Sequence, residues 1–226
     1  MAKLNLAISG ASGRVGKELL AICESSSEFH LSLQGDHHRP ICELKDIDVV
    51  VDFSSPKALS DLLVICADQK VPLVSGTTGL SEEDRKQMKK TSAKTAILWA
   101  SNMSLGINFV VRLLKNYGAL KDFDFQIEEA HHRHKVDAPS GTAMTLQEEL
   151  QKVCKNELPP PLSLRGGGIF GIHKIWAMSE EEVISLEHQA LNRKVFAKGA
   201  LVAAQWIVGK SAGLYGMQDV LDSELS

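Results

Sequence analysis

The sequence predicts an α/β protein: a doubly wound parallel sheet in its first half, then a smaller α+β domain with a mixed sheet. Three observations predict it. Short apolar segments alternate with helical patterns through the first hundred or so residues, a glycine-rich turn follows the first of these segments, and after residue 104 the pattern changes. Such alternation is typical of right-handed crossovers, with ligands at the carboxyl ends of the strands.

The apolar segments of the first half are the predicted strands, at residues 4–9, 30–33, 49–53, 71–74 and 95–100. Helices are expected from the glycine-rich turn to about residue 25 and from Pro56 to about residue 69. Another helix begins after Ser81, where three acidic residues suit a helix N-terminus.

The second half has a different organisation. A helix is predicted from residue 104 to about 117, and residues 123–128 alternate with period two, as in a half-buried strand. A helix at 142–155, strands within 164–178 and 183–188, and an apolar helix at 197–210 complete the prediction.

Composition narrows the class of protein. Hydrophobic residues make up 44% and charged residues 23%, as in ordinary globular proteins. A net charge of −3 without a basic run argues against a nucleic-acid partner. The sequence opens directly on a strand, without the regions of a signal peptide, and lacks the run of about 18 apolar residues that spans a membrane. Together with four scattered cysteines, this predicts a cytoplasmic protein without a membrane partner.

The first predicted strand leads into Gly10-x-x-Gly13-x-x-Gly16, which opens a helix. Glycines at this spacing let the backbone approach a pyrophosphate at a helix N-terminus, so the pattern predicts a Rossmann-like dinucleotide site. The alternative is a tight turn that needs small residues for packing. Asp36 suits ribose hydroxyls and NADH, whereas Arg39 and the histidines before it suit the 2′-phosphate of NADPH. The preference stays open, and Asp36 is equally a turn residue after Gly35.

Two further polar loops follow strands of the predicted sheet. The loop 76–79 offers backbone donors and two threonine hydroxyls for a nicotinamide ribose or a substrate carboxylate, unless it is an ordinary connection. Asn102 follows the fifth strand, where its amide suits a carboxamide and equally a helix cap.

Residues 131–135 hold three histidines, an arginine and a lysine in five positions. Mutual repulsion lowers the pKa of such groups toward the range of acid–base catalysis. A Pro-Ser-Gly turn follows, and Ser140 or Thr142 can cap a new helix whose free N–H groups bind a carboxylate. The segment predicts a site for a small anionic substrate. His131 and His134 have a metal-like spacing, but no third ligand is near, and a solvated basic loop does not need this turn chemistry.

These motifs in their order resemble the 4-hydroxy-tetrahydrodipicolinate reductase (dihydrodipicolinate reductase) family. The resemblance spans nearly the whole chain, and its most specific part is the run His131-His132-x-x-Lys135-x-Asp137-Ala-Pro-Ser-Gly-Thr. It rests also on the motifs at residues 10–16, 52–54, 76–79, 100–106 and 213–221.

The resemblance implies reduction of a cyclic imine dicarboxylate by NADPH or NADH, on the route to diaminopimelate and lysine. It implies that His131 and Lys135 are catalytic, and no metal is expected. The implied substrate-binding residues are His132, Lys135, Ser140, Gly141, Thr142 and Thr78. The implied cofactor-binding residues are Gly10, Ala11, Ser12, Gly13, Arg14, Val15, Asp36, Gly76, Thr77, Thr78, Ala100, Ser101, Asn102 and Met103.

The resemblance also implies a domain division. Residues 1–103 and 196–226 would form the dinucleotide-binding domain, and residues 104–195 the substrate-binding domain, whose sheet builds a homotetramer. Two other classes remain. Tyr117 and Lys121 mimic the catalytic pair of short-chain dehydrogenases, although Gly118 interrupts their helix, and a non-catalytic nucleotide sensor would not need the His131–Lys135 pair.

Overall fold

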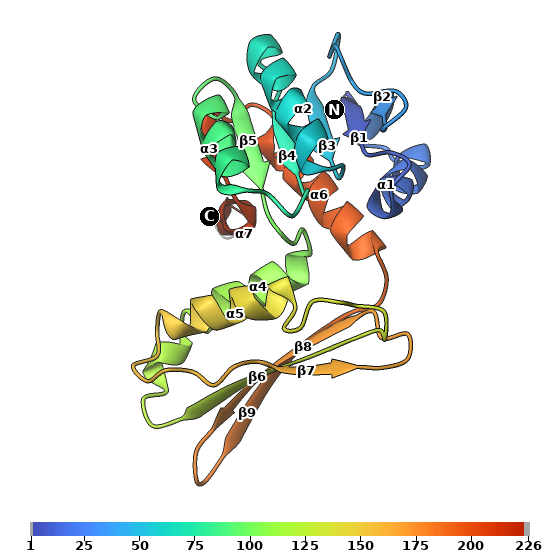
Figure 1. Ribbon diagram of the computed structural model, residues 1–226. Helices are drawn as coiled ribbons and strands as arrows, with labels where there is room; N and C mark the ends of the chain where they lie inside the picture. The colour runs from blue at the N-terminus through green and yellow to red at the C-terminus, as the bar shows by residue number, and fades with distance from the viewer. Residues whose placement is uncertain (1, 224–226) are drawn as a thin grey trace. The chain divides into compact units, whose positions relative to one another are not determined.

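Figure 1 shows the computed structural model, which describes residues 2–223. The chain divides into two compact units. The first comprises the residues up to Leu105 together with those from Arg193 onwards, and the second spans residues 106–192. Among the described residues, no helix combines the length and the apolar character that crossing a membrane requires.

The first unit contains a six-stranded sheet in the order β10-β5-β4-β3-β1-β2, and every pair of neighbours is parallel. The strands are β1 (Leu4–Ser9), β2 (Phe29–Gly35), β3 (Val49–Asp52), β4 (Leu73–Ser75), β5 (Ala96–Trp99) and β10 (Gly213–Tyr215). The helices are α1 (Arg14–Glu24), α2 (Pro56–Gln69), α3 (Glu82–Thr91), α6 (Lys194–Ile207) and α7 (Met217–Ser223). The five predicted strands are present.

Helices cover both faces of this sheet, which confirms the predicted doubly wound architecture. Alternate strand residues enter two separate cores: Ile8 packs in the cluster that includes residues of α1 and α6, and Ala7 in the cluster that includes residues of α2 and α3. Val51 and Val50 divide in the same way. Such strands are buried on both faces, which explains why they appear in the sequence as continuous apolar runs.

The strand order reverses at β1, which pairs with β2 on one side and with β3 on the other. A crevice opens at such a switch point, outside the carboxyl ends of the strands. The loop that begins at Gly10 leaves β1 there. The topology thus places the glycine motif where parallel sheets bind ligands.

The second unit is a four-stranded mixed sheet in the order β7-β6-β8-β9, confirming the predicted α+β half. Its strands are β6 (Asp124–His131), β7 (Leu162–Arg165), β8 (Gly171–Met178) and β9 (Val183–Ala190). Helices α4 (Leu105–Leu114) and α5 (Gly141–Gln151) lie across one face, as Figure 1 shows, and a core that includes Ile127, Leu146 and Ile175 fills the space between.

Several boundaries differ from the prediction. The strand predicted to end at residue 128 continues to His131, because its alternation extends through Glu129 and His131. Helix α4 ends at Leu114, shortly before Asn116 and Gly118, which do not favour helix continuation. Tyr117 therefore lies in a short 3₁₀ helix, η1 (Tyr117–Ala119), and Lys121 follows it, so this pair does not share a helical face.

Candidate active site

The glycine loop after β1 is packed too tightly for side chains. Gly10 has φ +80°, and a Cβ there would overlap the backbone carbonyl of Phe53 at the end of β3. A Cβ at Gly16 would overlap the carbonyl oxygen of Gly10. Both glycines are therefore required to bring α1, the loop and β3 together, which is also the packing reason for the motif.

Helix α1 begins at Arg14, and its N-cap residue is Gly13, which has no side chain to cap the helix. The N–H groups of a first helical turn lack helical partners and attract anions. Ser12 and Arg14 are exposed beside them, Val15 is half-buried, and Ala11 packs into the core. The loop therefore fits the pyrophosphate of a dinucleotide.

Asp36 lies just beyond β2, and its Oδ1 accepts the backbone N–H groups of His38 at 2.9 Å and Arg39 at 3.1 Å. These two hydrogen bonds lower the pKa of the Asp36 carboxyl, and a hydrogen bond from Ser12 adds to the effect. Asp36 is thus a turn residue, which is one of the two interpretations of the sequence. It also lies beside the glycine loop, as binding to ribose hydroxyls requires.

The loop after β4 is held by a buried carboxylate. Asp52 accepts hydrogen bonds from Ser54 Oγ at 2.5 Å, Ser75 Oγ at 2.8 Å and Thr77 Oγ1 at 2.7 Å. Thr77 Oγ1 also accepts the N–H of Ser54, so its hydroxyl serves the protein interior. Thr78, by contrast, is exposed.

At Gly76 and in the loop after β5, too, some residues are taken up by the protein interior and others are exposed. The ring of Phe53 occupies the position where a side chain at Gly76 would lie. Asn102 Oδ1 accepts the N–H of Ser104 at 3.0 Å, an Asx turn just before α4, and Met103 is a core residue. Ala100 is half-buried and Ser101 exposed.

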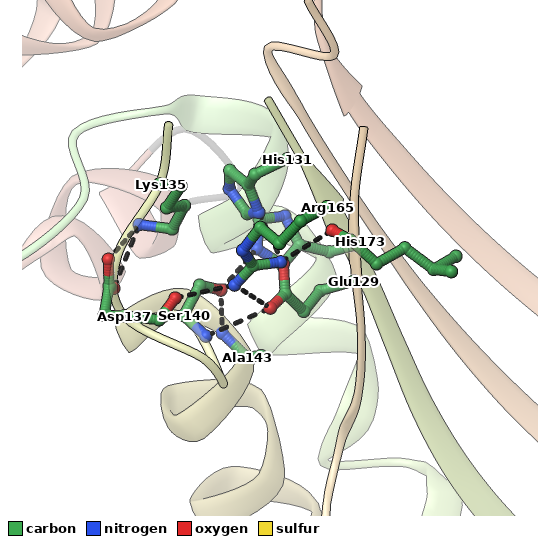
Figure 2. Close-up of polar contacts among 9 residues, drawn as sticks. Glu129, His131, Lys135, Asp137, Ser140, Ala143, Arg165 and His173 are labelled. Carbon is green, nitrogen blue, oxygen red and sulfur yellow. Dashed lines mark hydrogen bonds and ion pairs between the residues drawn. The ribbon is translucent and has the colours of Figure 1, made fainter. Parts of the chain in front are cut away.

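In the second unit, strand alternation gathers polar side chains on the helix-covered face of the sheet. Phe125 and Ile127 enter the core on this face, and Glu129 and His131 follow them at period two. The register places Glu129 opposite Ser163 of β7 and His173 of β8, and His131 opposite Arg165. One end of the sheet thereby carries an ionisable cluster, shown in Figure 2.

Glu129 is the centre of this cluster, and its side chain is fully buried. Arg165 binds it in a bidentate manner, with Nη1 2.9 Å from Oε2 and Nη2 2.6 Å from Oε1. His131 Nδ1 lies 2.5 Å from Oε2, and the N–H of Ser140 donates to Oε1 at 3.3 Å. Burial alone would raise the pKa of Glu129, but hydrogen bonds from Arg165, Ser163 and His131 lower it to about 2.

His131 is almost buried at the end of β6. Burial lowers the pKa of its imidazole, Glu129 acts in the opposite direction, and the charges of Lys135 and Arg165 add to the lowering. Its Nε2 faces Gly171, where a Cβ would lie only 3.2 Å away. Glycine at this position leaves room beside the nitrogen that does not contact Glu129.

The hydroxyl group of Ser140 forms hydrogen bonds within the protein. Its hydroxyl oxygen accepts the N–H of Ala143 as the N-cap of α5, and it lies 3.2 Å from Nε2 of His173. Burial and the charge of His131 lower the pKa of His173 to about 3, so His173 is neutral and its Nε2 shares a hydrogen bond with the Ser140 hydroxyl. Ser140 is thus the N-cap of α5, one of the two capping residues predicted from the sequence.

Lys135 forms an ion pair with Asp137, with Nζ 2.8 Å and 2.9 Å from the two carboxylate oxygens. The pKa of the Asp137 carboxyl is lowered, first by the Lys135 contact and least by the nearby backbone of Gly141. A carboxylate of the protein therefore binds the ammonium group and lies near the first residue of α5. These are the two anion-binding features that the sequence predicted for the substrate.

The other predicted residues of this segment surround the cluster. His132 and Thr142 are half-buried, Gly141 is exposed, and the His132 ring lies 6.2 Å from that of His134. Within the described residues no group of three His, Cys, Asp or Glu side chains has metal-binding geometry. His131 contacts the Glu129 carboxylate, and the His134 ring lies near that of His132.

Three members of the cluster were not predicted from the sequence: Glu129, Arg165 and His173. Arg165 follows Glu129 by 36 residues and His173 follows Ser140 by 33, so only the strand register brings them together. The one local signal was the continued alternation past residue 128, which places Glu129 on the face of His131.

Comparison with known proteins gives consistent matches along the chain. Residues 4–103 match the family described as dihydrodipicolinate reductase, N-terminus, and residues 106–221 its C-terminus. A 4-hydroxy-tetrahydrodipicolinate reductase of Bdellovibrio bacteriovorus is 46% identical over 224 residues, covering 98% of this chain and 97% of the relative. One from Xylella fastidiosa is 38% identical over 234 residues, covering 96% and 98%.

The fold has a solved counterpart. A dipicolinate-bound dihydrodipicolinate reductase from Paenisporosarcina sp. TG-14 aligns with a TM-score of 0.82 at 21% identity, covering 96% of this chain and 99% of that one. Fold and site together define an oxidoreductase with a nicotinamide nucleotide as its cofactor. Within that class, the chain belongs to the dihydrodipicolinate reductase family.

Proposed function

We propose that this protein reduces 4-hydroxy-tetrahydrodipicolinate to tetrahydrodipicolinate with NADPH or NADH, in the biosynthesis of diaminopimelate and lysine. Family membership over the whole chain supports this reaction. The observation that carries the chemistry is the buried Glu129–His131 contact, which leaves Nε2 of a histidine available beside Gly171. In this proposal the first unit binds the nucleotide and the second unit binds the substrate.

The bound nicotinamide nucleotide supplies the hydride. The protein must then manage one proton and two substrate carboxylates. His131 delivers the proton from Nε2 to the substrate ring. A bound dianion raises the pKa of a nearby imidazole, so substrate binding offsets the lowering that burial, Lys135 and Arg165 cause. The histidine is thereby protonated where its proton is needed.

Lys135 and the start of α5 bind the substrate carboxylates. An ammonium group and the N–H groups of a first helical turn both favour anions. The ion pair of Lys135 Nζ with the Asp137 carboxylate, near the backbone of Gly141, supports this assignment. We assign Gly141, Thr142 and His132 to the substrate as well, and Ser140 to the support of the turn.

Either nicotinamide nucleotide suits the first unit. Asp36 offers its carboxylate to ribose hydroxyls beside Ser12, and Arg39 follows in the same turn with a cation for a 2′-phosphate. Thr78 and Ser101 are the exposed members of their loops, and we assign both to the cofactor side. The backbones of residues 76–77 and 102–103 shape the same edge of the sheet.

The reaction is tested by following NADH and NADPH oxidation by absorbance, with substrate formed in situ by a synthase from pyruvate and aspartate semialdehyde. We expect rapid oxidation that requires the synthase. The ratio of the two rates measures the balance between Asp36 and Arg39. Cofactor binding without any oxidation would refute the assigned reaction and favour a nucleotide sensor.

Replacing Lys135 with alanine removes the ammonium group that faces Asp137. We expect the KM for the substrate to rise by about 10- to 100-fold, since a charge-assisted contact contributes roughly 1.5–3 kcal/mol. Nucleotide affinity, measured by fluorescence titration, should change less than twofold. Equal loss of both affinities would remove Lys135 from the substrate side.

We also propose a homotetramer in the cytoplasm. On the face of the second sheet opposite α4 and α5, Leu162 and Leu164 of the edge strand β7 are exposed by 55% and 53%, and Val183 of the other edge strand, β9, by 58%; association through this face would bury these side chains. The four cysteines are unpaired, as in a reducing compartment. Sedimentation velocity checks the assembly, and a species with the mass of one chain would contradict it.

A further inference from the structure

We infer that Glu129 is a positioning residue of the reaction: it holds the His131 imidazole with its proton on Nδ1, so that Nε2 alone exchanges a proton with the substrate. The inference rests on the proposed function, which gives His131 the proton-transfer step. It adds a residue that touches neither substrate nor cofactor and acts through the histidine.

The hydrogen-bond arrangement around Glu129 fixes the position of that proton. An ionised carboxylate only accepts hydrogen bonds, and Arg165 can only donate them. Oε2 contacts Arg165 Nη1 and His131 Nδ1, and Oε1 contacts Arg165 Nη2 and Ser140 N–H. Nδ1 of His131 must therefore carry a hydrogen (Figure 2). In neutral His131, the lone pair then lies on Nε2.

Arg165 keeps the carboxylate in the form that this arrangement needs. Its bidentate contact is the principal reason that the pKa of Glu129 falls to about 2 despite burial, so the carboxylate stays ionised across the working pH range. Arg165 Nη2 also donates to the backbone carbonyl of Asp137 at 2.6 Å. The same guanidinium therefore fixes both the histidine support and the turn that leads into α5.

A purely structural role for Glu129 is the alternative. Its contacts join β6, β7 and the start of α5, as an internal crosslink would. However, a buried ion pair adds little net stability compared with apolar residues of similar volume, so stability alone is a weak reason to bury a carboxylate here. The crosslink also does not need the contact to His131 Nδ1, which a positioning role requires.

The variant Glu129→Gln separates the two roles. Both carboxylate oxygens face a guanidinium nitrogen, so the amide nitrogen of glutamine meets a donor in either orientation. We expect turnover to fall on the order of 10²-fold or more, as when an amide replaces the acid that orients a catalytic histidine. Glu128→Gln is the matched control: it lies on the same strand with its side chain near Trp176 Nε1, and it should keep its turnover.

The pH profile is the measurement that a structural crosslink would not change. The negative charge of Glu129 raises the pKa of His131, and the glutamine variant lacks it. Turnover that depends on protonated His131 declines as the pH rises through that pKa. We expect this decline at lower pH in Glu129→Gln than in the wild type and in Glu128→Gln. A decline at unchanged pH, with turnover near wild type, overturns the inference.

Nitrogen NMR of the wild-type protein tests the tautomer without any variant of Glu129. With ¹⁵N-labelled histidine, and His131 identified by its absence from His131→Gln, the neutral ring should carry its hydrogen on Nδ1. A hydrogen on Nε2 overturns the inference even if the enzyme is active. If the wild type does not turn over at all, the proposed reaction fails, and the NMR result still decides the role of Glu129.

Discussion

Substitution of His131 by glutamine should reduce turnover by about 10²- to 10⁴-fold, the range that a positioned acid–base group contributes. Glutamine keeps a polar side chain of similar length at the end of β6, but it cannot carry a proton at the place of Nε2. The loss should appear in kcat, measured by nucleotide oxidation at saturating substrate. Binding of the nucleotide to the first unit should be unaffected, because His131 belongs to the second unit.

A control distinguishes loss of the proton from loss of the local fold. His134→Gln changes an exposed imidazole three positions later, whose ring lies near that of His132. We expect its kcat to stay within about threefold of the wild type, since an exposed group without close ionic partners contributes little. An active His131→Gln variant would exclude His131 from the mechanism.

Substitution of Gly199 by alanine should destabilise the first unit. Within a helix this change usually stabilises by about 0.5–1 kcal/mol, because alanine loses less conformational freedom. Here a Cβ would overlap the backbone carbonyl oxygen of Met103, which cannot rotate away as a side chain can. Overpacking of this kind costs about 1–3 kcal/mol or more. We expect the melting temperature to fall by roughly 4–12 °C.

Calorimetry checks this expectation, with Lys198→Ala as the neighbouring exposed control on α6. The control should change the melting temperature by no more than about 2 °C. Nucleotide affinity should also fall in Gly199→Ala, since Met103 follows Asn102 in the loop after β5. A rise in melting temperature would show that α6 does not pack closely against that loop.

Elements that depend on interactions between residues close in the sequence were predictable, and elements that depend on distant residues were not. The glycine loop and β1 to β5 were predictable because apolar segments, turn residues and helix starts are encoded within a few neighbouring positions. Strand β10, with three residues and a glycine at its first position, carries no such pattern. It forms because β5 offers it a parallel partner, which is a tertiary effect.

The candidate site divides in the same way. His131 and Lys135 stand in a compact motif, and their residue types alone indicate acid–base and anion chemistry. The capping role of Ser140 was predictable, but the contacts of the Ser140 and Thr77 hydroxyls with His173 and Asp52 were not, because only sheet pairing brings those partners near. A hydroxyl in a loop is available to a ligand only if the interior does not already bind it.

The contact of Asp137 with Lys135 bears on which anions the proposed substrate site would select. A tethered carboxylate competes as though present at about millimolar effective concentration, as for a ligand on a short flexible linker. Simple monocarboxylates of a metabolising cell, bound through one group, gain little by displacing it. A dicarboxylate that engages the ammonium group and the helix N-terminus through separate groups gains more, because its second contact is intramolecular. By competing for the ammonium group of Lys135, the side chain of Asp137 would weaken the binding of monocarboxylates more than that of dicarboxylates.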